Sequence, residues 1–298
     1  MAQVVNRTSR GSMMNDVGSK QIVIWETSAI SNLAMLRDCD DLIAQMNIAH
    51  NHWIPSYIFD EIAATPASEK REQLLCVCRK LIGNSGRVLI APFFLIEAAI
   101  RIFSEFGELD WEILLQTRPE FERAIDSGIF DDDLASVQQP QLQKGLLDAE
   151  VYFASARPLY ERLFQSSLKN HCALDEIIAQ ARSTGLIESN VQYYCQSILG
   201  ESVDLQYARR FTIAFPPIEA MICAFLMAHY HRNKPMPPRK PAGAIDLLAA
   251  TYLPVCDKYV SDDREQQSVL RDVAKYCSHQ AEVIWFSGVF RKQFSIRS

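Results

Sequence analysis

The sequence predicts an α/β fold of three layers with a parallel central sheet, interrupted by a large all-helical insertion. Short apolar, β-branched segments alternate with helical patterns near both ends of the chain. Residues 93–235 instead carry apolar side chains at three- and four-residue spacing, with almost no strand pattern. Alternation of strand and helix predicts parallel strands joined by right-handed crossovers, and the spacing in the middle predicts helices.

These patterns divide the chain into three expected parts. Residues 1–20 are polar and are expected to be disordered. Residues 21–92 and 236–298 are expected to form the α/β core. Residues 93–235 form the helical insert between its two halves.

The composition is that of an ordinary globular protein. Hydrophobic residues make up 48% of the 298 residues and charged residues 22%. The net charge of −6 means that nucleic acid would have to be held by a local basic patch. The N-terminus has no signal-peptide pattern, and the longest apolar stretch, residues 218–230, is too short to cross a bilayer. We therefore expect a cytoplasmic protein without membrane contact.

Most of the eight cysteines lie among apolar residues, and none form paired CxxC ligand sets. Reduced thiols in the core of a cytosolic protein are the favoured interpretation.

The first elements follow the N-terminal tail. Residues 21–26 are short, β-branched and apolar on both faces, which is typical of a buried parallel strand. Ser28 is the expected N-cap of a helix over residues 29–36. Another helix is expected over residues 39–49.

A second group of elements begins at Pro55, which suits the start of a short helix that carries Glu61. Residues 69–82 predict a longer helix, because they are followed by Gly83. Residues 87–91 predict a strand that ends before Pro92.

In the insert, helical periodicity is clearest over residues 94–106, 148–164, 174–183, 189–199 and 217–231. The proline-rich segment 235–241 is an expected stiff, basic connector. After it, residues 245–253 predict a helix, 258–261 a strand, 265–277 a helix and 283–286 a last strand. We expect the strand over residues 258–261 to lie beside and parallel to the first strand.

Acidic residues at the ends of apolar segments are the main functional signal: Glu26, Glu61, Asp246 and the pair Asp262-Asp263. Carboxylates at the carboxyl ends of parallel strands face the crevice where α/β proteins bind ligands. Several carboxylates in one crevice repel one another, and a divalent cation relieves this repulsion. Taken singly, Asp246 is equally explained as a helix cap, and Asp262-Asp263 as a turn and helix start.

Four short motifs in order resemble the PIN domain, a nuclease fold that includes many ribonuclease toxins. They are Glu26-Thr27-Ser28, Glu61 after an apolar segment, Asp246 opening Asp-Leu-Leu-Ala-Ala, and Val260-Ser261-Asp262-Asp263. The resemblance covers residues 21–65 and 240–290. Two features depart from the family pattern: Glu26 replaces the usual Asp, and the insert is far longer than in a compact PIN domain.

The resemblance implies a metal-dependent ribonuclease that uses Mg²⁺ or Mn²⁺ and leaves a 5′-phosphate. Glu26 and Asp246 would be the principal metal ligands, completed by Glu61 and the Asp262-Asp263 pair. Within that pair the family pattern favours Asp263, so that Asp262 is expected to face solvent or to cap the following helix. Thr27, Ser28 and Ser261 would support the site, with Ser28 and Ser261 orienting carboxylates and waters.

Several other residues are weaker candidates. Arg239 and Lys240, and then Arg209-Arg210, are candidates for phosphate contacts. Asp131-Asp132-Asp133 is better explained as a solvated loop. His50 and His52, like His229 and His231, would point in different directions on a helix. Glu97 lies in an apolar helix and is expected to face either solvent or the site.

Three functions remain open from the sequence. RNA is favoured over DNA as the substrate of a nuclease, and an antitoxin is the partner that a toxin would need. The replacement of Asp by Glu26 instead favours a PIN-like scaffold with a weakened site that binds a protein partner. A structure-specific DNA nuclease is the third reading.

Overall fold

The computed structural model describes residues 20–83, 86–115, 174–232, 243–277 and 279–294, together with scattered residues between 136 and 158. Several predictions lie outside this part of the chain: the disordered tail over residues 1–19, most of the helix over residues 148–164, Asp131-Asp132-Asp133, and Arg239 and Lys240.

Five parallel strands form one central sheet in the order β3-β2-β1-β4-β5. Their bounds are β1 Gln21–Trp25, β2 His50–Pro55, β3 Arg87–Leu89, β4 Lys258–Ser261 and β5 Glu282–Trp285. Ile24 of β1 lies opposite Tyr259 of β4, so the predicted pairing of these two strands is confirmed.

The sheet is the middle of three layers, because alternate residues of each strand point to opposite faces. Val23 and Trp25 of β1 belong to one buried cluster, with α1 Thr27–Ala34, α2 Cys39–Ala49, α3 Ser56–Ala63 and α4 Ser68–Ile82. Ile22 and Ile24 belong to a second cluster on the other face. The predicted α/β architecture with a parallel sheet is therefore confirmed.

Other helices cover the second face. They are α5 Pro92–Phe106, α9 Leu174–Ser183, α10 Leu186–Leu199, α11 Leu205–Ala214, α12 Pro216–Arg232, α13 Ala244–Leu248 and α14 Arg264–Tyr276. The short pieces α6 Trp111–Leu114 and η1 Ala249–Tyr252 lie with them, whereas η2 Phe286–Phe290 packs on the first face and is followed by η3 Arg291–Gln293. In the described part of the chain, every element between β3 and α13 is a helix.

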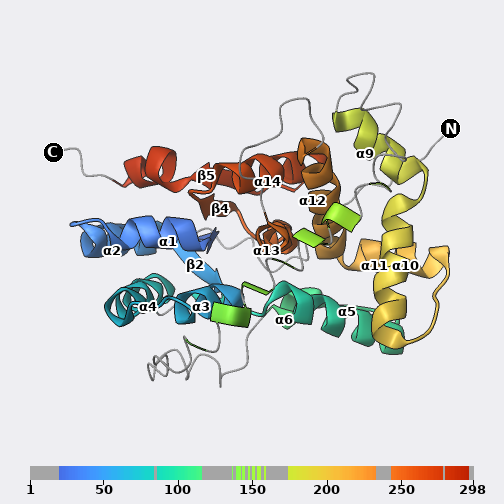
Figure 1. The fold of residues 1–298 in the computed structure, drawn as a ribbon, viewed down its shortest axis with the longest axis horizontal. Helices are drawn as coiled ribbons and strands as arrows, with labels where there is room; N and C mark the ends of the chain where they lie inside the picture. The colour runs from blue at the N-terminus through green and yellow to red at the C-terminus, as the bar shows by residue number, and fades with distance from the viewer. Residues whose placement is uncertain are drawn as a thin grey trace.

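These insert helices are built onto the sheet. Val191 of α10, Phe211 of α11 and Met221 of α12 belong to the same buried cluster as Ile22 and Ile24. Figure 1 shows α9, α10 and α11 gathered at the end of the molecule opposite α2 and α4. The insert thus extends the core on one face of the sheet.

Three elements differ from the sequence predictions. β2 was not expected, because His50-Asn51-His52 breaks the apolar pattern of a buried strand. α11 was also not expected. The cap of α1 is Glu26 and not Ser28: the Glu26 side chain accepts a hydrogen bond from the Ser28 N–H, so the helix begins two residues earlier than predicted.

No single helix in the described ranges has the length and apolar character needed to cross a membrane. α11 and α12 reach that length and composition only as a pair, and they are bent by 104° relative to each other.

Candidate functional site

The candidate site lies at the point where the order of strands along the chain reverses, between β1 and β4. From β1 the chain builds β2 and β3 on one side, and it returns later to build β4 and β5 on the other side. The carboxyl ends of β1 and β4 therefore flank the crevice in which open α/β sheets bind ligands. Glu26 directly follows β1, and its N–H donates to the carbonyl of Val260 in β4 at 3.0 Å.

Glu26 is held by hydrogen bonds to one of its two carboxylate oxygens. Oε2 accepts bonds from the Ser28 N–H at 2.7 Å, from the Ser28 hydroxyl and from the Ser261 hydroxyl at 3.3 Å. Oε1 accepts no hydrogen bond from any described residue. The cap of α1 thus fixes the carboxylate and leaves one oxygen available.

Glu61 reaches the same place from α3. The predicted Pro55 start is confirmed, because Pro55 ends β2 and α3 begins at the next residue. The Thr27 hydroxyl donates to Oε2 of Glu61. Its Oε1, like that of Glu26, receives no hydrogen bond within the described ranges.

Asp246 lies in the first turn of α13. Its Oδ2 accepts a 2.9 Å hydrogen bond from the Gly243 N–H, which stabilises the start of the helix. Its main-chain carbonyl accepts a 3.1 Å bond from Nε2 of Gln266 on α14. Asp246 therefore has the capping role weighed above and is also positioned by α14.

Asp263 and Asp262 have separate roles. Asp263 caps α14: its Oδ1 accepts bonds from the N–H groups of Glu265 and Gln266, both at 2.9 Å. Asp262 accepts bonds from Asn32 at 2.6 Å and from the N–H and hydroxyl of Ser287 at 2.9 and 2.5 Å. The prediction that Asp262 faces solvent or caps the helix is wrong, because it ties α1 to the segment after β5.

The pKa values of the two glutamates reflect their burial and the charges of neighbouring carboxylates. Burial raises the pKa of Glu26 to about 7; the hydrogen bonds from Ser28 oppose this shift, and the charges of Asp246 and Asp263 add to it. Burial also raises the pKa of Glu61 to about 7; the Thr27 hydrogen bond opposes this shift, and the charges of Glu26 and Asp246 add to it. Asp262 is not among the groups that act on either glutamate.

The donor chemistry of this acidic site, defined as Glu26, Glu61, Asp246 and Asp263, fits a hard divalent cation. All four offer carboxylate oxygens, which Mg²⁺ and Mn²⁺ prefer, and a bound cation would keep Glu26 and Glu61 ionised. No three of their oxygens lie within 4.8 Å of one another in the described structure. Mg²⁺ keeps several water ligands and binds through one or two carboxylates, so a fully closed cage is not required.

A different group of ligating atoms lies on the insert side. Glu219 and Cys223 of α12 and Cys277 after α14 bring their ligand atoms within 4.8 Å of one another. Soft thiolates suit zinc and not magnesium, so this group does not compete with the acidic site for Mg²⁺. The cysteines that the structure describes are free, and all except Cys76 are buried.

Other candidates from the sequence lie elsewhere. On β2, and not on a helix as assumed, His50 and His52 share a face and are both buried. His231 bonds Asp272 at 2.9 Å, whereas His229 packs on Phe153.

Glu97 and Arg209 form ion pairs on helix surfaces, whereas Arg210 lies over the Tyr207 ring at 6.0 Å. Glu97 pairs with Arg101 four residues later, at 2.8 Å. Arg209 pairs with Glu188 at 3.1 Å.

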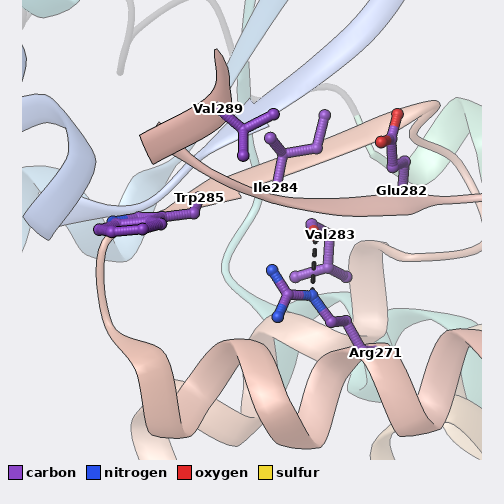
Figure 2. Close-up of a pocket in the computed structure, with 6 residues that line it drawn as sticks. All are labelled: Arg271, Glu282, Val283, Ile284, Trp285 and Val289. Carbon is purple, nitrogen blue, oxygen red and sulfur yellow. Dashed lines mark hydrogen bonds between the residues drawn. The ribbon is translucent and has the colours of Figure 1, made fainter. Parts of the chain in front are cut away.

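Two of the hollows in the described structure lie at the edge of the sheet and beside Glu61. One, of 360 Å³, follows the edge strand β5, where Nε of Arg271 donates to the carbonyl of Val283 at 3.1 Å (Figure 2). It contains none of the four acidic-site residues. The other, of 190 Å³, opens beside Glu61 and is lined by Tyr57, Asp60, Glu61, Ala91, Pro92, Phe93, Ile245 and Leu248.

Sequence reasoning missed several residues around the site. Asn32 lies four residues after Ser28, so it shares a helix face with Ser28 and could have been found. Gln266, Ser287, Asp60 and Phe93 belong to segments whose approach depends on the tertiary fold.

Comparisons of the chain with protein-family models, with curated proteins and with solved structures find no match.

Proposed function

We propose that this protein is a metal-dependent ribonuclease with a PIN-like core. The observation that carries the proposal is Glu26 at the β1–β4 crevice, whose charge interacts with those of Glu61, Asp246 and Asp263, with burial raising the pKa of Glu26 and Glu61 to about 7. Buried carboxylates that raise one another's pKa are costly for the fold, and such groups cluster at functional sites. The order of the acidic motifs along the chain, which resembles the PIN domain, agrees with this assignment.

In this proposal the four acidic residues have different roles in holding the cation. Glu26 and Asp246 are the principal ligands of Mg²⁺ or Mn²⁺, and Glu61 and Asp263 complete the acidic site directly or through water. When bound, the cation supplies a hydroxide nucleophile and neutralises charge that develops on the phosphate. Asp262 leaves the proposed ligand set, because its two oxygens are engaged by Asn32 and Ser287.

The polar residues around the carboxylates hold them in place. Ser28 and Ser261 orient Glu26, and Thr27 orients Glu61. Such supporting hydrogen bonds hold the carboxylates in place, so that little reorganisation is needed when a cation binds. The half-buried setting limits the access of bulk water, which strengthens every charge interaction within the site.

The test is a cleavage assay on single-stranded RNA with Mg²⁺ or Mn²⁺, repeated with EDTA. Asp246→Asn and Glu26→Gln should each lower kcat/KM by more than about 100-fold, since several kcal/mol of charge stabilisation depends on the cation. Glu97→Gln is the matched control, because Glu97 lies in a surface ion pair. Cleavage that survives EDTA, or full activity of both site variants, would refute the metal mechanism.

One observation favours a second candidate, a PIN-like scaffold whose site no longer cleaves. Oε2 of Glu26 accepts three hydrogen bonds and caps its own helix, which is a sufficient structural reason to retain this residue. Calorimetry separates the two candidates: an intact fold that binds no Mn²⁺ would support the scaffold. Parallel assays on single-stranded DNA and DNA flaps test the third reading.

A further inference from the structure

The hollow beside Glu61, which we call the side hollow, opens directly onto the acidic site. Tyr57, Asp60 and Glu61 on α3 form one wall, and Ile245 and Leu248 on α13 form another. Glu61 belongs to both the hollow and the acidic site. The hollow therefore lies next to the position that the reacting phosphate would occupy.

Phe93 is an exposed aromatic residue that lines this hollow. Its side chain lies in the first turn of α5, and the residue is 60% exposed. Its neighbour Phe94 is equally exposed, at 59%, but does not line the hollow. An exposed aromatic ring beside apolar walls provides a flat stacking surface, which single-stranded nucleic acids use for their bases.

Asp60 gives the same hollow a specific polar group. Its carboxylate is partly buried there and accepts no hydrogen bond from any residue that the structure describes. A partly desolvated carboxylate is stabilised by N–H donors brought into the hollow. Guanine presents two adjacent donors on one edge, N1–H and the N2 amino group, and these match the two oxygens of a carboxylate.

We propose that the side hollow binds a guanine base of single-stranded RNA, with Phe93 stacking on the base and Asp60 accepting hydrogen bonds from N1–H and the N2 amino group. This inference rests on the proposed nuclease function and specifies its substrate. Phe93 would supply affinity for any base, and Asp60 would supply the preference for guanine. The acidic site would then cut the chain beside that nucleotide.

Fluorescence anisotropy with short labelled RNAs tests the proposal without cleavage. One RNA carries a single guanosine in an adenosine background, and its partner carries inosine, which lacks only the N2 amino group. Measurements in EDTA keep the RNA intact. Wild type should bind the guanosine RNA about tenfold more tightly than the inosine RNA, a difference expected from one hydrogen bond to a charged group.

Matched variants assign the two roles. Asp60→Asn should remove the preference for guanosine over inosine, whereas Asp41→Asn on the surface of α2 should leave it unchanged. Phe93→Ala should weaken binding of both RNAs by about tenfold or more, as loss of base stacking does elsewhere. Phe106→Ala, an equally exposed ring at the other end of α5, should not. Equal binding of the two RNAs by wild type, or a preference that survives Asp60→Asn, would overturn the proposal.

The same measurements distinguish this proposal from the nuclease proposal. Guanosine-selective binding by a protein that never cleaves RNA would support the side hollow as a guanine site and refute the nuclease proposal. Metal-dependent cleavage without any preference at guanosine would support the nuclease proposal and refute the guanine-binding role of the side hollow.

Discussion

Ser261, the last residue of β4, donates a 3.3 Å hydrogen bond from its hydroxyl to Oε2 of Glu26, the residue that follows β1. The same hydroxyl oxygen accepts the N–H of Asp263 at 3.0 Å. One buried side chain thus fixes the relative positions of two acidic-site carboxylates that are more than 230 residues apart in the chain.

Ser261→Ala should therefore weaken metal binding while leaving the strand pairing intact. The expected loss of Mn²⁺ affinity is about 10- to 100-fold, as for other residues that orient metal ligands. Calorimetric titration with Mn²⁺ measures this change. Ser189→Ala is the control, since that hydroxyl only bonds a carbonyl within its own helix end. Unchanged affinity in Ser261→Ala would show that Glu26 does not need this support.

The raised pKa values of Glu26 and Glu61 predict how the effect of Mg²⁺ on stability depends on pH. The folded state holds extra protons between the ordinary pKa of 4.5 and the shifted value of about 7. These two groups therefore contribute stability below pH 4.5, and this contribution is lost as the pH rises to 7. A cation binds the ionised forms, so Mg²⁺ should raise Tm more at about pH 8 than at about pH 5.5.

Calorimetric melts with and without Mg²⁺ check this pH dependence. The comparison is made at each pH separately, so that other titrating groups cancel. Glu26→Gln should shrink the difference between the two pH values, whereas Glu69→Gln, on the exposed start of α4, should not. An equal rise in Tm at both pH values would contradict binding at the acidic site.

Asp263→Asn and Asp262→Asn should separate catalysis from stability. Asn caps helices about as well as Asp, so Asp263→Asn should keep α14 intact but lower kcat/KM by roughly 100-fold. Asp262→Asn should retain most of the activity but cost about 1–2 kcal/mol of unfolding free energy, because the charged acceptor of Asn32 and Ser287 is lost. Urea melts and single-turnover cleavage measure the two effects. A larger loss of activity in Asp262→Asn would reverse the assignment.

The buried pair Trp25 and His52 should stabilise the sheet. Nε1 of Trp25 donates to Nδ1 of His52 at 2.9 Å. His52→Phe should cost about 1–3 kcal/mol, because it leaves the buried indole N–H without its acceptor. A double-mutant cycle in urea checks the pair: the same substitution should cost less in a Trp25→Phe background. Equal costs in both backgrounds would mean that the hydrogen bond contributes nothing.

The sequence predicted the parallel sheet and the gathering of acids at β1 and β4, because buried strands and capped helices carry strong local patterns. Strand β2 was not predicted, because the His50-Asn51-His52 segment is polar and its burial depends on contacts with Trp25 and with aromatic residues after β5. The hydrogen-bonding roles of Asp262 and Asp263 could not be predicted from the sequence either. Whether a residue after a strand caps the next helix or bonds Asn32 and Ser287 depends on contacts with distant segments.

The most direct measurement is anomalous X-ray diffraction from crystals of the protein soaked with Mn²⁺. A manganese peak is expected in the crevice between β1 and β4, bonded to oxygens of Glu26 and Asp246. The peak should be absent from crystals of Asp246→Asn. An ordered crevice with no manganese at saturating concentration, or manganese bound only at other residues, would show that the acidic site does not bind the cation.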